Sequence, residues 1–179
     1  MMSQFLCLKI FMIITMKGKN YMKYEIWCDG ASSNNGKSNS CGGWAYLIVK
    51  DGDIIKSNSG GQLNATNNQM ELLSALNGLK EVEKIISPFD SVDIYSDSAY
   101  FINCVKQKWY KAWEKNGWKT ASKQPVLNQN LWNELIPFFD SCQFNFNKTK
   151  AHCGVKFNEL VDSMAVAARE EVLKSATQS

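Results

Sequence analysis

Four acidic residues lie where the sequence predicts that secondary-structure elements meet. Asp29 stands at the end of a predicted strand, and Asp97 directly follows another strand in the stretch SVDIYSDSAY. Glu71 lies in the first two turns of a predicted helix and Asp162 lies on the last helix, each beside an apolar face. If the two strands are parallel neighbours, both aspartates leave the sheet at the same carboxyl edge, where open α/β sheets bind their ligands.

Carboxylates that converge in this way could bind metal ions. They repel one another, and they stay ionised together only when cations neutralise them. Oxygen ligands without a histidine or thiolate cluster favour Mg²⁺, for which Mn²⁺ can substitute. Two such ions about 4 Å apart suit in-line phosphoryl chemistry, because one activates water while the other stabilises the leaving oxygen.

Each of these acids also has an ordinary structural explanation. An aspartate after a strand is most often a turn or helix cap, as Asp97 could be. Glu71 could complement the dipole at the start of its helix, and Asp162 could lie on a solvated helix surface. Spacing alone leaves both interpretations open.

The elements that must position the acids alternate between strands and helices. The chain should begin with a strand over 23–30 and two strands within 44–61 that are joined through Asp51-Gly52. A helix whose Thr66 and Gln69 form a capping box follows, and then a strand just before Asp97. The rest should be a helix from about Ala99, helical stretches over 109–119 and 131–139, a strand over 142–150, and a final helix with an apolar stripe. An antiparallel meander followed by strands that crossover helices reach predicts an α/β fold with a mixed sheet.

The composition suits one soluble domain. The chain has 179 residues, enough for a proper core without disulfide staples, and 45% of them are hydrophobic. Its six cysteines show no CxxC or CxxH spacing, which disfavours a zinc site. We therefore expect reduced thiols, a cytoplasmic location and a monomer.

Positive charge is concentrated in one segment. The net charge is only +3, yet residues 106–123 contain six lysines and a single acid, Glu114. Such a patch predicts an anionic partner at one place. Trp109 and Trp113 are four positions apart and could simply be core, but basic segments with aromatic residues suit nucleic-acid backbones. Our interpretation is that the tryptophans pack the segment while its lysines face phosphate.

The first 22 residues show no usable pattern for the domain. The apolar stretch Phe5–Met16 is too short to span a bilayer, and no small-x-small cleavage site follows it. It could be a signal-peptide core, or the product of an early start codon, since Met16 and Met22 are in frame. We expect residues 1–22 to be a disordered or dispensable extension, residues 23–179 to be the domain, and no membrane to be a partner.

Four local sequences, in order, point to one family. They are CDGA at 28–31, TNNQMEL at 66–72, YSDSAY at 95–100 and HCGVKFNELVDSMA at 152–165. Together they resemble type 1 ribonuclease H, which cleaves the RNA strand of an RNA–DNA hybrid. The resemblance runs from about Tyr24 to Val172. It implies the ribonuclease H-like fold, a five-stranded mixed sheet in the order 3-2-1-4-5 with flanking helices.

The segment WYKAWEKNGWKTASKQPV at 109–126, which we name the protrusion, resembles the basic protrusion of bacterial-type enzymes. Carried over residue by residue, the resemblance makes Asp29, Glu71, Asp97 and Asp162 the metal-binding carboxylates. It makes His152 a loop residue that assists proton transfer or product release. The implied contacts to the hybrid are Thr66, Asn67, Asn68, Trp109, Lys111, Lys115 and Lys119.

The sequence departs from the family pattern at three places. The loop after Asp29 is longer than in many bacterial members and lacks their proline, which leaves a hybrid contact by Asn34 or Asn35 unassigned. Ala99 replaces a glutamine that contacts the minor groove, and Glu114 replaces a lysine of the protrusion. The implied activity is hydrolysis with two Mg²⁺ ions, leaving 5′-phosphate and 3′-hydroxyl ends. The alternatives are a catalytically silent hybrid-binding module and a related nuclease that acts on DNA.

Overall fold

Five strands form one mixed sheet in the computed structural model, which describes residues 21–33, 40–141, 143–150 and 154–178. The strands are β1 (Lys23–Ser33), β2 (Cys41–Lys50), β3 (Asp53–Leu63), β4 (Ser91–Ser96) and β5 (Phe144–Lys148). Their order across the sheet is β3-β2-β1-β4-β5. The β1–β2 and β2–β3 pairs are antiparallel, whereas β4 runs parallel to both β1 and β5. The predicted mixed sheet and its 3-2-1-4-5 order are therefore confirmed.

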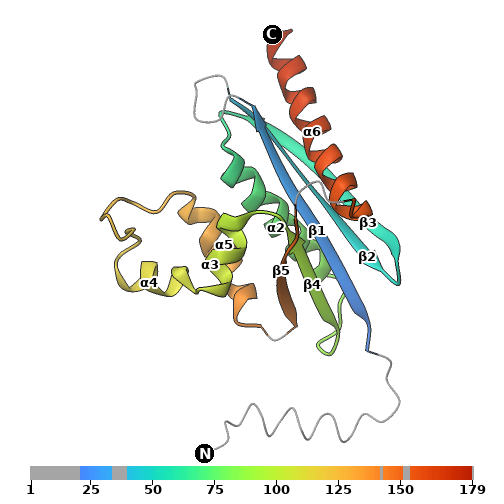
Figure 1. Ribbon diagram of the computed structural model, residues 1–179, viewed down its shortest axis with the longest axis horizontal. Coiled ribbons are helices and arrows are strands. Elements are labelled where there is room, and N and C mark those ends of the chain that lie inside the picture. Colours follow the sequence, from blue (N-terminus) through green and yellow to red (C-terminus); the bar gives the residue numbers. More distant parts are fainter. Residues whose placement is uncertain (1–20, 34–39, 142, 151–153, 179) are drawn as a thin grey trace, which may run out of the picture.

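Helices cover both faces of the sheet (Figure 1). They are α2 (Asn67–Glu83), α3 (Ala99–Lys106), α4 (Trp109–Lys115), α5 (Gln129–Phe139) and α6 (Lys156–Thr177). Alternate side chains of β1 point to opposite faces. Ile26 and Cys28 join the core beneath α2, α3 and α5, whereas Trp27 and Ala31 join a smaller core beneath α6. None of the helices in the described part of the chain is long and apolar enough to cross a membrane.

The first strand is longer than the sequence predicts. It continues past Gly30 to Ser33, because β2 stays paired with it as far as Ser33 opposite Cys41. Its parallel pairing with β4 ends earlier, at Trp27 opposite Tyr95. Asp29 and Asp97 each lie two residues beyond that last parallel pair, so the two acids lie at the same level of the sheet.

The helix of the protrusion is shorter than the predicted 109–119. It ends at Lys115 because Gly117 and Trp118 adopt left-handed backbone angles, with φ of 64° and 58°. An isolated bridge between Lys119 and Pro125 then closes a turn. The last strand is also shorter than predicted, at Phe144–Lys148 instead of 142–150.

Two glycines let helices approach the sheet unusually closely. A Cβ on Gly30 would lie 2.3 Å from the backbone nitrogen of Glu71, and one on Gly43 would lie 2.1 Å from the carbonyl oxygen of Ala165. Contacts that short do not occur with a real side chain, so any other residue would push α2 or α6 outwards. The two glycines therefore bring the helices that carry Glu71 and Asp162 close to the central strands.

A chain that starts at Met22 should fold and act like the full chain. Residues 1–20 lie outside the described residues, so their predicted role stays a prediction. The Met22 nitrogen donates to the Asp90 carboxylate at 2.9 Å, and its carbonyl accepts from the Ser91 nitrogen at 3.0 Å; the shorter chain keeps both contacts. It loses the Tyr21–Phe89 ring contact, which is worth about 1 kcal/mol. We expect a melting temperature lower by no more than about 5 °C. A larger fall by calorimetry would show that the removed residues stabilise the domain.

Candidate active site

Three of the four predicted carboxylates meet at one edge of the sheet. Asp29, Glu71 and Asp97 each offer an oxygen atom, and these oxygens all lie within 4.8 Å of one another. They come from β1, from α2 and from the residue that follows β4. Asp29 is 7% exposed and Glu71 is 5% exposed, whereas Asp97 is half-buried. We call these three side chains the carboxylate cluster.

The electrostatics of the carboxylate cluster favour a bound cation. Burial, followed by the charge of Asp97, raises the pKa of Asp29 to about 7, although the Gly30 N–H donates to this carboxylate at 2.7 Å. Burial and the charges of Asp29 and Asp97 raise the pKa of Glu71 well above its ordinary value. Full ionisation of the cluster therefore costs free energy, which a divalent cation would offset.

One oxygen of Glu71 is held and the other is available to a ligand. The Asn67 side-chain amide donates to Oε1 of Glu71 at 3.3 Å. Oε2 of Glu71 is buried but has no hydrogen-bond partner in the described structure. A buried carboxylate oxygen without a partner is costly, so this atom suits a metal ligand. Sequence reasoning missed the contact from Asn67 to Glu71, which the i, i+4 spacing on a helix could have indicated.

Of the remaining residues predicted near the carboxylate cluster, the structure describes Asp162 but not His152. Asp162 is half-buried on α6 and is not one of the three clustered acids, yet its charge helps to raise the pKa of Asp29. The structure therefore brings Asp162 into the electrostatic surroundings of Asp29. His152, Asn34 and Asn35 lie outside the described residues.

The ordinary explanations of the acids fit less well than a shared site. Ser98, and not Asp97, is the N-cap of α3, and its hydroxyl accepts from the Phe101 N–H at 3.3 Å. Glu71 is buried beyond the first turn of α2, whose N-cap is Thr66. Neither capping nor a solvated helix start therefore accounts for these two acids.

A hollow of about 770 Å³ lies between the start of α2, α3 and the protrusion. Thr66, Asn68 and Trp109, three of the predicted hybrid contacts, line it together with Tyr100 and residues 120–122 and 124–128. The predicted contacts from α2 therefore divide between two places. Thr66 and Asn68 face the hollow, whereas Asn67 contacts the carboxylate cluster.

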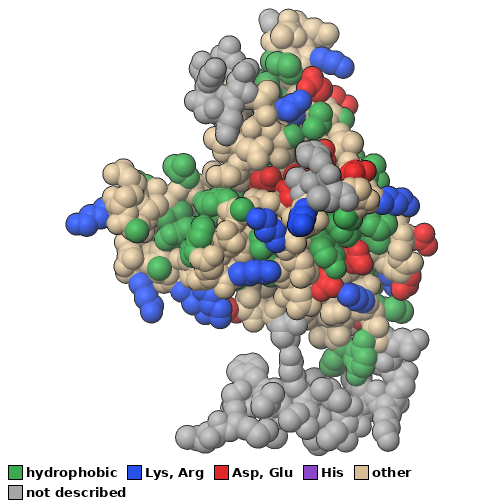
Figure 2. Space-filling view, in the orientation of Figure 1, with side chains coloured by type: hydrophobic (Ala, Val, Ile, Leu, Met, Phe, Trp, Pro, Cys, Tyr) green, Lys and Arg blue, Asp and Glu red, His purple; other side chains and the backbone are tan. Residues whose placement is uncertain are grey.

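The tryptophans of the protrusion pack against one another and against α5. The ring of Trp113 lies 6.4 Å from that of Trp109, 6.1 Å from that of Trp118 and 5.5 Å from that of Trp132, measured between centroids. The predicted lysine contacts are Lys111, Lys115 and Lys119, and all three are exposed. Figure 2 shows Lys and Arg side chains along this side of the molecule. Lys111 lies 3.5 Å from the Asp140 carboxylate.

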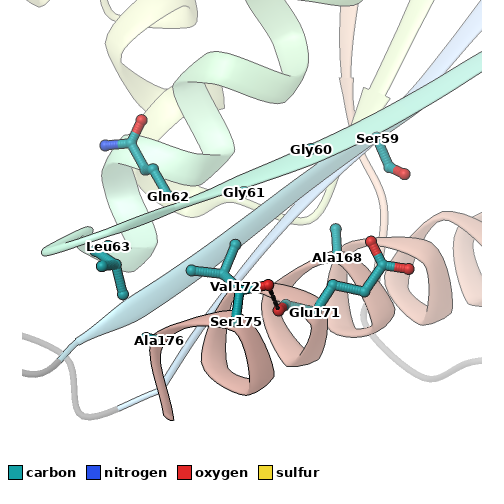
Figure 3. A pocket seen from close by; sticks show the side chains of 10 residues that line it. All are labelled: Ser59, Gly60, Gly61, Gln62, Leu63, Ala168, Glu171, Val172, Ser175 and Ala176. Atoms are coloured by element: carbon teal, nitrogen blue, oxygen red, sulfur yellow. Dashed lines mark hydrogen bonds between the residues drawn. The ribbon is translucent and has the colours of Figure 1, made fainter. Parts of the chain in front are cut away.

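A second hollow, of about 440 Å³, lies between β3 and the C-terminal half of α6 (Figure 3). Gly60, Gly61, Ala168 and Val172 are among its lining residues, and none of the predicted site residues lines it. It is therefore separate from the carboxylate cluster.

The fold and the carboxylate cluster together define a ribonuclease H-like α/β protein with a candidate metal site at the carboxyl ends of its central parallel strands. The sequence model of the RNase H family matches residues 21–170, so the chain belongs to the RNase H family of enzymes.

Individual relatives agree with this assignment. The ribonuclease H of Caldanaerobacter subterraneus subsp. tengcongensis is 39% identical over 159 residues, which cover 89% of this chain and 98% of the relative. The crystal structure of a type 1 RNase H with the type 2 active-site motif superposes with a TM-score of 0.71 and 22% identity, over 87% of this chain and 75% of that one. The crystal structure of LC11-RNase H1 in complex with RNA/DNA hybrid has a TM-score of 0.58 and 16% identity, over 81% and 98%. These structural similarities show the fold.

Proposed function

We propose that this protein is an endonuclease that hydrolyses the RNA strand of RNA–DNA hybrids with two bound metal ions, leaving 5′-phosphate and 3′-hydroxyl ends. The observation that carries the proposal is the carboxylate cluster, with oxygens within 4.8 Å of one another and a buried, unpartnered Oε2 on Glu71. The hybrid bound in a solved structure of the same fold supports the choice of substrate.

Four acids of this chain would hold Mg²⁺, or Mn²⁺ in its place: Asp29, Glu71, Asp97 and Asp162. When bound, the ions would lower the pKa of a water molecule and stabilise negative charge on the leaving oxygen. The hydrogen bond from Asn67 fixes the orientation of Glu71, so that Oε2 stays directed to a ligand. The N–H of Gly30 does the same for Asp29.

The surroundings of the carboxylate cluster suit a hybrid duplex. Asn67 and Asn68 can donate to and accept from a ribose 2′-hydroxyl, the group that distinguishes RNA from DNA. Thr66 and Trp109 line the hollow beside them, where a strand of the duplex could rest. Lysines of the protrusion provide positive charge for phosphates. A monomer acting in the cytoplasm stays a prediction from the sequence.

The test is a comparison of end-labelled substrates. The protein is incubated with hybrid, single-stranded RNA, duplex RNA and duplex DNA, with Mg²⁺ or with EDTA. We expect cleavage of the RNA in the hybrid, with Mg²⁺ only. Binding of the hybrid without cleavage would indicate the silent module, and cleavage of duplex DNA alone would indicate the DNA-acting nuclease.

Changing Lys111, Lys115 and Lys119 to alanine should raise KM for the hybrid more than it lowers kcat. Each lost phosphate contact should flatten the dependence of log K on log salt by about 0.7 to 0.9, because fewer counterions are released on binding. Binding titrations at several salt concentrations measure this slope.

The charge-matched control for that triple variant is the alanine variant of Lys56, Lys80 and Lys84. These exposed lysines form ion pairs with Glu81 or Glu134 on α2 and α5. The control should leave the salt slope unchanged. Equal slopes for both variants would mean that the protrusion does not touch the phosphate backbone.

Replacing His152 with alanine should slow turnover by about 10²- to 10⁴-fold, the range of general acid–base assistance, while activity stays measurable. An imidazole titrates near neutral pH and can carry or release a proton there. Affinity for the hybrid should change little, since one loop side chain is a small part of the contact. An unchanged kcat in steady-state kinetics would show that the histidine has no role in the reaction.

A further inference from the structure

Three lysines outside the protrusion lie around the last strand and the start of the last helix. Lys148 ends β5, Lys150 follows two positions later, and Lys156 is the first residue of α6. We call them the β5–α6 lysines. All three are exposed, and no acid in the described part of the chain forms an ion pair with any of them. Lys156 Nζ lies 5.3 Å from the centroid of the Phe157 ring, and none of the three charges is neutralised by an acid in those residues.

Backbone register places the β5–α6 lysines beside the carboxylate cluster. Lys148 lies opposite Ser96, and the nitrogen of Thr149 donates to the Ser96 carbonyl at 3.0 Å, so this segment runs beside Asp97. Neighbouring strands are about 4.8 Å apart. Lys156 precedes Asp162 by six residues of α6, a rise of about 9 Å. By backbone position all three lysines lie within about 1 nm of a predicted metal ligand.

We propose that the β5–α6 lysines bind phosphates of the RNA strand next to the bond that is cleaved, an inference that rests on the proposed function. Phosphates of one strand follow one another at about 3.4 Å of axial rise. Groups within about 1 nm of the acids therefore reach the next phosphates of the strand being cut.

The DNA strand of the hybrid is not expected to be within reach of the β5–α6 lysines. The minor groove of an A-like duplex is wide, so the DNA strand is separated from the scissile phosphate across that groove. The hollow lined by Thr66, Asn68 and Trp109 lies beside the protrusion, β5 is the edge strand next to α3, and α6 covers the opposite face of the sheet (Figure 1). On this proposal the protrusion faces DNA, and the β5–α6 lysines, which lie near the acids along the backbone, face RNA.

The test measures whether removing a lysine charge and removing a single phosphate charge have additive effects on hybrid binding. Full-length protein and its Lys148→Gln, Lys150→Gln, Lys156→Gln variant are titrated in EDTA with hybrids that carry one neutral methylphosphonate linkage at successive positions of either strand. If a lysine contacts the altered phosphate, the two changes have non-additive effects on the free energy of binding, whereas changes at independent groups have additive effects. We expect the neutral linkage near the cleavage site in RNA to weaken binding by the full-length protein but not by the variant. The same linkage in DNA should weaken binding by both equally.

The variant should also flatten the salt slope of hybrid binding by about 2 to 3 units, because three phosphate contacts are lost. The matching arginine variant should restore the slope, since it keeps the charge. The control is Lys174→Gln, an exposed lysine about 27 Å further along α6, which should behave like the unchanged protein.

Two results would overturn the inference: an unchanged salt slope in a variant that keeps its melting temperature, or non-additivity with linkages in the DNA strand. Because binding is measured in EDTA, the outcome does not depend on turnover. A protein that never cleaves hybrid with Mg²⁺ would contradict the proposed function, whereas a protein that cleaves hybrid but lacks the expected coupling would contradict this inference alone.

Discussion

Asp97→Asn is expected to lower kcat on the hybrid by about 10³-fold or more while the protein still folds. The substitution keeps the shape of the side chain but removes the charge that a metal ion would contact. Metal ions supply several kcal/mol of transition-state stabilisation, and each 1.4 kcal/mol is about tenfold in rate. Ser98, and not Asp97, caps α3, so the helix should stay intact.

Single-turnover kinetics with Mg²⁺ measure this effect, and circular dichroism checks the fold. The matched control is Asp53→Asn, which changes an exposed aspartate at the start of β3 and should keep full activity. A folded Asp97→Asn protein with near-normal turnover would contradict the assignment of the carboxylate cluster as the active site.

Asp29→Asn should abolish cleavage and yet raise the melting temperature of the metal-free protein at pH 8. Burial and the charge of Asp97 raise the pKa of Asp29 to about 7, so ionising it in the folded state costs free energy that the unfolded state does not incur. The difference from the ordinary value corresponds to on the order of 4 kcal/mol. Asparagine removes this cost.

The pH dependence follows from the same linkage. Between pH 4 and about 7 the folded protein binds the Asp29 proton more tightly than the unfolded chain does. The stabilising contribution of Asp29 is therefore present in full below pH 4 and is lost as the pH rises through about 7. The stability of Asp29→Asn minus that of the unchanged protein should grow over this range in EDTA.

Magnesium should reverse the order of the melting temperatures of Asp29→Asn and the unchanged protein. At pH 8 it should raise the melting temperature of the unchanged protein more than that of Asp29→Asn, because binding to the folded state stabilises it. The Asp53→Asn protein should follow the unchanged protein throughout. A metal-free Asp29→Asn protein that melts at the same or a lower temperature at pH 8 would show that neither burial nor the neighbouring acids make ionisation of Asp29 costly.

Much of the fold was accessible from the sequence because local patterns and connection rules both constrain it. The resemblance to a known family implied the 3-2-1-4-5 order, and the position of Asp97 after a strand already indicated a site at the carboxyl edge. Strand and helix ends were less accessible. Ser33 is still in β1 because β2 continues beside it, and this tertiary pairing is encoded by no local pattern. The helix predicted to reach residue 119 ends at Lys115, because Gly117 and Trp118 adopt left-handed backbone angles.

The candidate site was predictable in its acids and less so in its supporting contacts. The residue types of Asp29, Glu71 and Asp97 and their places in the chain were sufficient to suggest a cluster. The hydrogen bond from Asn67 to Glu71 was hidden, because the same asparagine resembles a residue that contacts the hybrid. The tight approach at Gly30 depends on how α2 crosses β1, which appears only in three dimensions.

The close packing at Gly30 and Gly43 makes the geometry of the site depend on the packing of two helices. The acids on α2 and α6 lie near the central strands only while both helices remain packed against those glycines. A local opening of either helix would separate its acid from β1 without unfolding the rest. If the acids hold a metal ion as proposed, its affinity should therefore depend on the less stable of these two helix–sheet contacts. A substitution that loosens α6 near Gly43 should speed amide exchange in that helix and weaken metal binding together, although it touches none of the four acids.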